Sequence, residues 1–240
     1  MNLIKTLLSL IFPLECRICK KTLEAENLTY ICSECFTKIR FIEEPYCLRC
    51  SRPLRPFENR ICKDCRKKKR YFKRIYSMGL YQGVLRKTIL LLKYQRVKAL
   101  IPPLGELLLK YCQRNLKMSG FDLLLPVPLF RSKKRHREFN QADAFTRIIA
   151  EHYSLPLSNK NLLRIRDTKS MSNLNSEERR KNVRGAFIVK EEEEVRNRKI
   201  LLIDDICTTA ATVDECSKVL LTAGVKEVTV LTLARTTSKI

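Results

Sequence analysis

The spacing of eight cysteines near the start of the chain is the strongest constraint on what it can fold into. They form four C-x-x-C pairs before residue 66: Cys16 and Cys19, Cys32 and Cys35, Cys47 and Cys50, Cys62 and Cys65. Each pair can aim two thiolates at one ion, and two pairs complete the tetrahedral shell of a structural zinc site. The spacing predicts two four-cysteine zinc sites, and it leaves open whether the pairs combine sequentially or interleaved.

The metal-binding spacing of the cysteines also bears on the cellular compartment of the protein. A segment this small and polar needs metal to fold, and a redox C-x-x-C would need a surrounding βαβ pattern that is missing here. Cysteines that bind metal rather than form disulfides indicate a reducing compartment, and we expect the cytoplasm. No apolar run reaches the roughly 20 residues of a membrane span. The apolar start, residues 1–12, is expected to form an amphipathic helix rather than a signal peptide, because no cleavage site follows it.

After the cysteines, apolar strands alternate with amphipathic helices. We expect strands at 76–83, 121–129, 161–166, 185–189, 199–206 and 227–235, and helices at 84–96, 104–116, 140–153 and 212–224. This alternation predicts an α/β fold with a mostly parallel sheet flanked by helices. The basic run at 66–74 marks the boundary between two expected domains, residues 1–68 and residues 71–240.

One predicted strand ends in two carboxylates, Asp204 and Asp205, and the hydroxyls of Thr208, Thr209 and Thr212 follow. In open α/β sheets, ligands bind at the carboxyl ends of strands. Carboxylates can accept hydrogen bonds from a ribose diol, and the N–H groups at a helix start bind phosphate. The pattern predicts a ribose 5-phosphate site. The plainer alternative is a strand-end turn in which Thr212 only caps the helix.

Glycine placement argues against two other nucleotide sites. A Walker B strand also ends in acidic residues, but it needs a G-x-x-x-x-G-K-[ST] loop, and a dinucleotide fold needs G-x-G-x-x-G. The six glycines stand at 79, 83, 105, 120, 185 and 224, and they fit neither pattern.

Several motifs taken together resemble the ComF family of competence proteins. The segment "ILLIDDICTTAAT" is similar to the phosphoribosyl-diphosphate (PRPP) loop of type I phosphoribosyltransferases. The segments "LLLPVPL", "REFNQADAF" and "LNSEERRKNVRGAF", after four C-x-x-C pairs, extend the resemblance over almost the whole chain. It implies a double zinc-ribbon module followed by a type I phosphoribosyltransferase-like domain. It also implies a role in natural transformation, in which incoming single-stranded DNA reaches the cytoplasm.

The resemblance also implies which residues bind PRPP. Asp204 and Asp205 would hold the ribose diol as the catalytic pair, with Mg²⁺ bridging ribose and diphosphate oxygens. The other PRPP contacts would be Cys207, Thr208, Thr209, Ala210, Ala211, Thr212, Lys133 and Arg135, and a covering loop would supply Arg179, Arg180 and Arg184. The family pattern has Gly at positions 210 and 138 and Gln at 171, where this chain has Ala210, Glu138 and Met171. If residue 210 needs a positive φ, alanine there costs about 1 kcal/mol.

The chain is strongly basic, with a net charge of +23, and the excess is uneven. Residues 1–120 hold 26 Lys and Arg against 9 Asp and Glu, whereas residues 121–240 hold 22 against 16. Such a balance favours polyanionic partners. In proteins that bind single-stranded DNA, cations contact the phosphates and aromatic rings stack on the bases. We therefore expect single-stranded DNA contacts at Lys67, Lys68, Lys69, Arg70, Tyr71 and Phe72.

Two functions stay open on these observations. One is a PRPP-binding module that also binds single-stranded DNA and assists its uptake. The other is an active phosphoribosyltransferase that moves ribose 5-phosphate from PRPP to a nucleobase-type acceptor. Contact between the zinc ribbons and a competence helicase is compatible with both.

Overall fold

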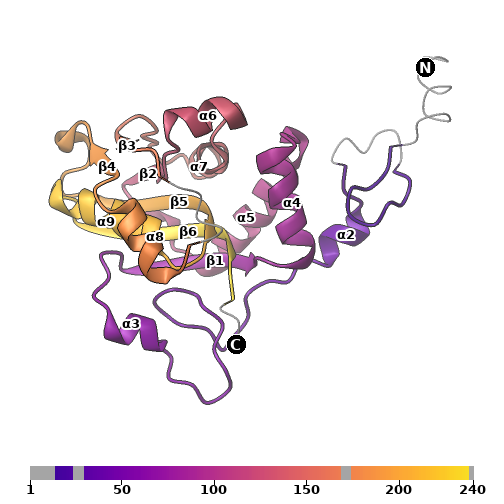
Figure 1. The fold of residues 1–240 in the computed structure, drawn as a ribbon, viewed down its shortest axis with the longest axis horizontal. Coiled ribbons are helices and arrows are strands. Elements are labelled where there is room, and N and C mark those ends of the chain that lie inside the picture. The colour runs from indigo at the N-terminus through magenta and orange to yellow at the C-terminus, as the bar shows by residue number, and fades with distance from the viewer. Residues whose placement is uncertain (1–13, 24–29, 169–173, 238–240) are drawn as a thin grey trace.

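A four-stranded sheet forms the centre of the protein, in a computed structural model that describes residues 14–23, 30–168 and 174–237 (Figure 1). The strand order is β1 (Arg74–Leu80), β6 (Glu227–Arg235), β5 (Lys199–Cys207) and β2 (Leu123–Pro126). All three neighbouring pairs run parallel. The predicted α/β fold with a mostly parallel sheet is therefore confirmed.

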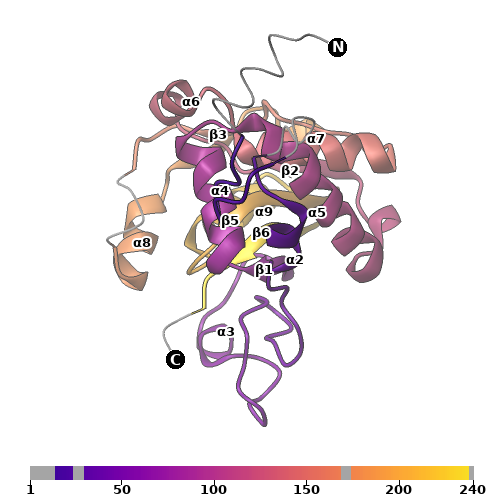
Figure 2. The ribbon, with the colours of Figure 1, turned by 90° about the vertical axis from the view of Figure 1, so that its right-hand side faces the viewer.

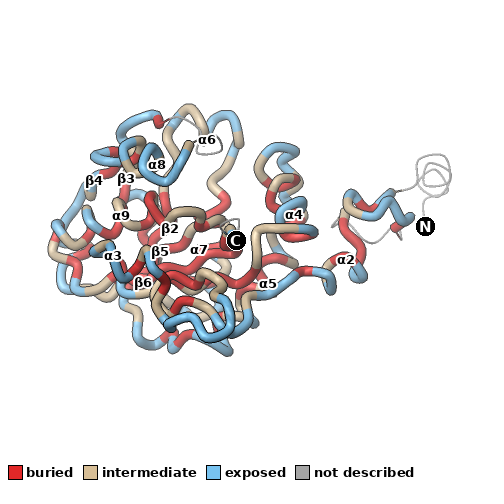
Figure 3. The backbone as a smooth tube through the Cα atoms, turned by 60° about the horizontal axis from the view of Figure 1, so that its bottom comes forward, coloured by how far each residue is buried: buried red, intermediate tan, exposed pale blue. Residues whose placement is uncertain are grey.

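Helices cover both faces of this sheet, as parallel strands require. The helices α4 (Gly83–Tyr94), α5 (Ile101–Asn115) and α7 (Gln141–Tyr153) pack on one face, where β5 contributes Leu201 and Ile203. The helix α9 (Ala211–Thr222) packs on the other, against Ile200 and Leu202. Figure 3 shows the buried strands running between the partly exposed helices.

A two-stranded antiparallel hairpin stands apart from the main sheet. It pairs β3 (Leu162–Arg164) with β4 (Phe187–Val189), and α8 (Ser176–Val183) lies between them in the chain. The strands predicted at 161–166 and 185–189 therefore exist, but they do not join the parallel sheet. The side chain of Asn175 and Glu178 form a capping box that fixes the start of α8.

Short elements complete the described chain. They are α2 (Ser33–Thr37), α3 (Lys63–Lys67), α6 (Arg131–Arg137), and the 3₁₀ turns η1 (Lys98–Leu100), η2 (Met118–Gly120) and η3 (Glu192–Glu194). The apolar start and Met171 lie outside the described residues. Among the helices that the structure describes, none has the length and apolar character needed to cross a bilayer.

The cysteine-rich segment contains two copies of one small motif. Isolated bridges join Glu15 to Thr22 and Tyr46 to Pro53, at matching positions around the first C-x-x-C pair of each copy. After each of these pairs the backbone enters the left-handed region, at Lys20 (φ 67°) and Ser51 (φ 54°). Their N–H groups donate to the carbonyls of Cys16 and Cys47, both at 2.8 Å, which closes each knuckle.

The ribbon segment is anchored to the free edge of β1 (Figure 2). Ile42 N–H donates to the Met78 carbonyl at 3.0 Å, and Leu80 N–H donates to the Arg40 carbonyl at 2.9 Å. Between these bonds lies Gly79, where an added Cβ would stand 3.0 Å from the Arg40 carbonyl oxygen. Glycine therefore allows this close approach. The division into residues 1–68 and 71–240 stays a prediction, but the two parts share backbone hydrogen bonds.

Candidate functional site

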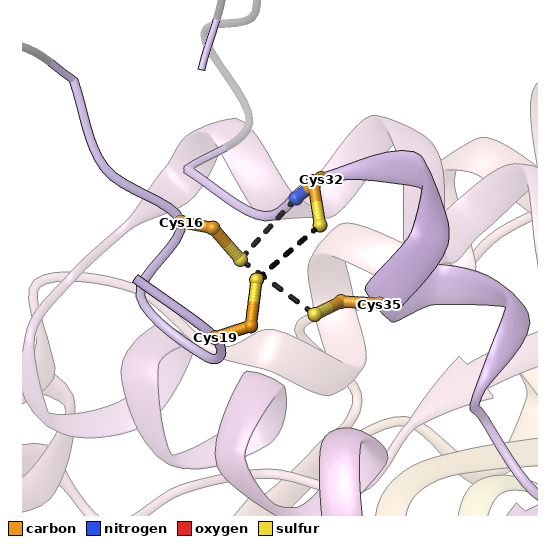
Figure 4. A group of neighbouring side chains, drawn as sticks. All are labelled: Cys16, Cys19, Cys32 and Cys35. Atoms are coloured by element: carbon orange, nitrogen blue, oxygen red, sulfur yellow. Dashed lines mark hydrogen bonds between the residues drawn. The ribbon is translucent and has the colours of Figure 1, made fainter. Parts of the chain in front are cut away.

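Eight cysteines gather into two groups, and the pairing that the sequence left open is sequential. Cys16, Cys19, Cys32 and Cys35 form one group, with all sulfurs within 4.8 Å of one another (Figure 4). Cys47, Cys50, Cys62 and Cys65 form the second in the same way. The first group packs with the core on the α4 side of the sheet, and the second packs with the core on the α9 side.

The sulfur geometry fits zinc. Four thiolates at about 2.3 Å from a tetrahedral ion lie about 3.8 Å apart. The Cys16–Cys35 and Cys19–Cys32 sulfurs are 3.7 Å apart, and the Cys50–Cys62 sulfurs are 3.8 Å apart. Backbone N–H groups of Cys32 and Cys62 donate to the sulfurs of Cys16 and Cys47, at 3.4 and 3.3 Å, and such bonds stabilise thiolates. Both groups are suited to structural zinc.

Asp204 and Asp205 lie at the carboxyl end of β5, and strand alternation turns their side chains to opposite faces of the sheet. Asp205 Oδ2 forms an ion pair with Lys93 Nζ of α4 at 2.6 Å, and both side chains are largely buried. Asp204 Oδ1 instead accepts the N–H of Asp205 at 2.8 Å. Burial, followed by the neighbouring charge of Asp205, raises the pKa of Asp204 to about 7.

The segment after β5 forms a tight loop into α9. Ala210 is the N-cap residue and has φ 64°, so the position that carries glycine in the resembled family does adopt the left-handed conformation. Alanine has no side-chain acceptor to satisfy the first N–H groups of α9. The predicted capping by Thr212 is not found, because Thr212 lies inside the helix. The hydroxyls of Thr208 and Thr209 are half-buried in the same loop.

Lys133 lies on α6, in the segment after β2, and it contacts the hairpin. Its Nζ donates to the Thr168 carbonyl at 2.6 Å and lies 3.7 Å from Asp167 Oδ1. Arg135 is exposed on the same helix. Glu138 ends α6 with φ 67°, and its carboxylate is paired with Arg96 and, at 3.5 Å, with Lys98. Its negative charge is therefore already balanced by these two cations.

Two domain families match the chain in the expected order. A double zinc ribbon domain matches residues 7–66, and a phosphoribosyl transferase domain matches residues 144–240. Competence protein F of Haemophilus influenzae is 29% identical over 93% of this chain and 98% of its own. DNA utilization protein YhgH of Salmonella typhimurium is 27% identical over 92% of this chain and 96% of its own. The chain is therefore similar to competence protein F and to DNA utilization proteins over nearly its whole length. The resemblance seen in its motifs is thus confirmed, as is the fold class of a phosphoribosyltransferase-like domain after a double zinc ribbon.

More distant structural likenesses also exist. An allosteric regulatory enzyme of purine biosynthesis aligns with a TM-score of 0.38 and 19% identity, over 55% of this chain and 25% of that one. A Leishmania donovani hypoxanthine-guanine phosphoribosyl transferase aligns with a TM-score of 0.30 and 18% identity, over 55% and 66%. Similarity at this level carries no functional argument.

The predicted covering-loop arginines of this chain lie beside α9. Arg179 and Arg180 lie on α8, which packs against α9, and Arg184 follows at its end. The Gly185 N–H donates to Glu215 Oε1 of α9 at 2.8 Å. The structure therefore brings this segment to the helix that begins at the predicted phosphate loop, while residues 169–173 lie outside the described part.

The predicted DNA-contact segment is only partly accessible, which requires a correction. Phe72 is 1% exposed in the core, and Arg70 is buried and ion-paired with Asp214 of α9 at 3.3 Å. Neither can meet a DNA strand, because both anchor the chain as it enters β1. Lys67, Lys69 and Tyr71 are exposed, and Lys68 is half-buried.

Two further residues of this region belong to no motif of the sequence. Lys93 lies in the amphipathic helix α4, and its one sequence signal is that it is a lone cation within "ILLLKY". Arg235 ends the apolar strand β6 and is 1% exposed. It donates to the sulfurs of Cys207, in the predicted PRPP loop, and of Cys50, in the second cysteine group. A cation at the end of an otherwise apolar strand was its only sequence signal.

Proposed function

We propose that this protein binds PRPP with Mg²⁺ at the carboxyl end of β5 and also binds single-stranded DNA, and that it assists DNA uptake in the cytoplasm. The observation that carries the PRPP site is the loop from Asp204 to the uncapped start of α9. A helix N-terminus without a side-chain acceptor offers N–H groups and a favourable dipole to a phosphate. The phosphoribosyl transferase match over residues 144–240 supports the same site.

The two carboxylates have different tasks in this proposal. Asp204 faces the α9 side, where its charge contributes, after burial, to the raised pKa of the Cys216 thiol. It accepts a hydrogen bond from one ribose hydroxyl. Asp205 is held by Lys93 through Oδ2, which leaves its other oxygen for the neighbouring hydroxyl, since a carboxylate has acceptor sites on both oxygens. Mg²⁺, when bound together with PRPP, would neutralise the charge of the diphosphate beside these two carboxylates.

Calorimetry with PRPP and Mg²⁺ tests this site. Asp204→Ala combined with Asp205→Ala removes both acceptors, and we expect binding to be lost. Glu192→Ala combined with Glu193→Ala removes the same charge from an exposed turn and should leave binding unchanged. If the Asp204/Asp205 variant binds like the wild type, the site is assigned wrongly.

Binding of single-stranded DNA is proposed from the net charge of +23 and from the family relatives. Relatives named competence protein F and DNA utilization protein support a role in competence. The test is binding of labelled single-stranded DNA with and without PRPP and Mg²⁺. A protein that fails to bind at about 50 mM salt, where electrostatic contacts are strong, has no such role. The zinc ribbons are the proposed contact for a competence helicase.

Transferase turnover is the alternative function. The match to a phosphoribosyl transferase domain favours it. Release of diphosphate from PRPP that depends on an added nucleobase would establish turnover. DNA binding that responds to PRPP without diphosphate release would establish the binding module.

A further inference from the structure

A basic groove lies at the amino ends of the strands, away from the predicted PRPP loop, and no function has been given to it. Its volume is about 550 Å³, and it is bounded by the second zinc ribbon, by β1 and by the turn η2. Five cations line it, and they come from four different parts of the chain: Arg49, Lys73, Arg74, Lys117 and Lys199.

The charges in this groove are largely uncompensated. Glu227 is the one acidic residue of the lining, and it pairs with Lys73 at 2.7 Å. Neither Lys117 nor Lys199 forms an ion pair within the part of the chain that the structure describes. The Asp122 carboxylate lies nearby and accepts the backbone N–H of Lys199 at 2.8 Å, so it offsets part of this charge. A groove that gathers four cations with so little counter-charge attracts a polyanion.

The groove also presents rings and apolar side chains. The Arg74 guanidinium lies over the Tyr76 ring at 4.4 Å from the ring centre. Tyr76 and Phe121 both line the groove, together with Leu48 and Ile61 of the ribbon. Both rings are half-buried and keep an accessible part. Cations that alternate with rings match a single strand, whose phosphates need charge and whose unpaired bases need stacking partners. In a duplex the bases are stacked inside the helix, and an acidic peptide has no bases. Neither ligand would therefore use the aromatic rings of the groove.

A second basic pocket of the protein is a weaker candidate for this role. It contains Arg131, Lys134 and Arg164, but it also includes Pro128 and Phe130 of the segment after β2. That segment carries Lys133 and Arg135, which are among the predicted PRPP contacts. Its cations are therefore already explained by the proposed PRPP site, and those of the groove are not.

We propose that this groove is the binding site for single-stranded DNA, with phosphates on Lys117, Lys199 and Arg49 and with bases on Tyr76 and Phe121. The inference rests on the proposed DNA-binding function and identifies where on the protein the DNA binds. Lys199 begins β5 and Asp205 lies six residues later, so the groove and the PRPP loop are about 20 Å apart. Both ligands can therefore bind at once.

Fluorescence anisotropy with labelled oligo(dT) of about 20 nucleotides tests the groove across a salt series. Lys117→Gln combined with Lys199→Gln removes two phosphate contacts. The slope of log K against log salt should fall by about 1.4, and affinity at about 0.1 M salt should fall roughly 20-fold. Lys181→Gln combined with Lys190→Gln removes equal charge from exposed sites on α8 and after β4, and it should change little.

A second measurement locates the bases. Oligonucleotides that carry 5-iododeoxyuridine crosslink to stacked aromatic rings under ultraviolet light, and mass spectrometry identifies the peptide. We expect crosslinks at Tyr76 or Phe121 and weaker binding of duplex DNA. Crosslinks only at Tyr71 or Tyr94, or equal losses in both lysine pairs, would overturn the groove while DNA binding stands. If the wild type binds no oligonucleotide at low salt, the proposed DNA function itself fails, and the groove assignment fails with it.

Discussion

Arg235, the last residue of β6, donates a hydrogen bond to the sulfur of Cys50 over 3.6 Å. A second nitrogen of the same guanidinium donates to the sulfur of Cys207 at the end of β5. The arginine is buried, and no carboxylate pairs with it among the described residues. A zinc ion held by four thiolates carries a net charge of −2. The second zinc site is therefore the counter-charge that permits burial of Arg235, and Arg235 joins that site to the predicted PRPP loop.

Replacing Arg235 by methionine should destabilise the protein strongly. A buried charge that loses its partner costs about 3–5 kcal/mol, and here the zinc–thiolate group would lose its cation. We expect the free energy of unfolding in urea to fall by that order. Zinc should also leave one site faster when a colour-forming chelator is added. Arg235→Lys keeps the charge and should restore part of the stability, and equal losses in both variants would contradict the charge argument.

Loss of one cysteine ligand should empty either zinc site. Cys32 and Cys62 have equivalent positions in the two ribbons, because the N–H of each donates to the first cysteine of its group. We expect about two zinc ions per wild-type chain and about one in either Cys→Ser variant. Of the two variants, only Cys62→Ser removes a ligand from the second zinc site, whose Cys50 sulfur accepts a hydrogen bond from Arg235.

PRPP calorimetry separates these two variants. Binding should be weakened in Cys62→Ser and nearly normal in Cys32→Ser. The first ribbon packs on the α4 side and does not reach the PRPP loop through Arg235. Equal weakening in both variants would show that the loop does not depend on the second site.

Ala210→Gly should stabilise the protein. Ala210 has φ 64°, a conformation that costs an L-residue about 1 kcal/mol and costs glycine nothing. The greater freedom of glycine in the unfolded chain offsets part of this gain. We expect a net increase of up to about 1 kcal/mol in the free energy of unfolding, and unchanged or tighter PRPP binding. The matched control is Ala211→Gly at the first residue of α9, where glycine relieves no positive φ and should instead destabilise, by less than the roughly 1 kcal/mol of a helix interior.

The parts of this structure that local sequence patterns determine were predictable. Cysteine spacing indicates zinc ribbons, and the apolar run of β5 with its two terminal carboxylates indicates the ligand end of a sheet. The contacts between distant segments could not be predicted from such patterns. Arg235 and Cys50 are 185 residues apart, and no local pattern links them. Lys93 meets Asp205 only because α4 packs over β5.

Two features depend on tertiary contacts that composition and strand propensity do not encode. Phe72 stands in a basic run, so composition suggested exposure, but the chain there enters β1 and the ring turns into the core. The strands β3 and β4 have the same short apolar pattern as sheet strands. Their pairing with each other depends on the excursion through α8, which strand propensity does not encode.

Asp204 should make both stability and PRPP binding depend on pH. Its pKa in the folded protein is about 7, whereas an aspartate in the unfolded chain has a pKa near 3.9. The unfolded chain releases this proton first as the pH rises. The group therefore lowers stability progressively between about pH 4 and pH 7, and the full penalty remains above pH 7.

Asp204→Asn removes this ionisation. Relative to wild type, the variant should gain most stability at about pH 8, about a third as much at about pH 5, and almost none below about pH 4. PRPP affinity should show the opposite dependence, because the ionised carboxylate is the stronger acceptor for a ribose hydroxyl. Wild-type affinity should rise through pH 7 by more than the affinity of Asp204→Asn. Phosphate groups of PRPP titrate in the same range, and the difference between the two proteins removes their contribution. Urea unfolding and calorimetry at several pH values measure both effects, and parallel affinity profiles for the two proteins would exclude Asp204 from the diol contact.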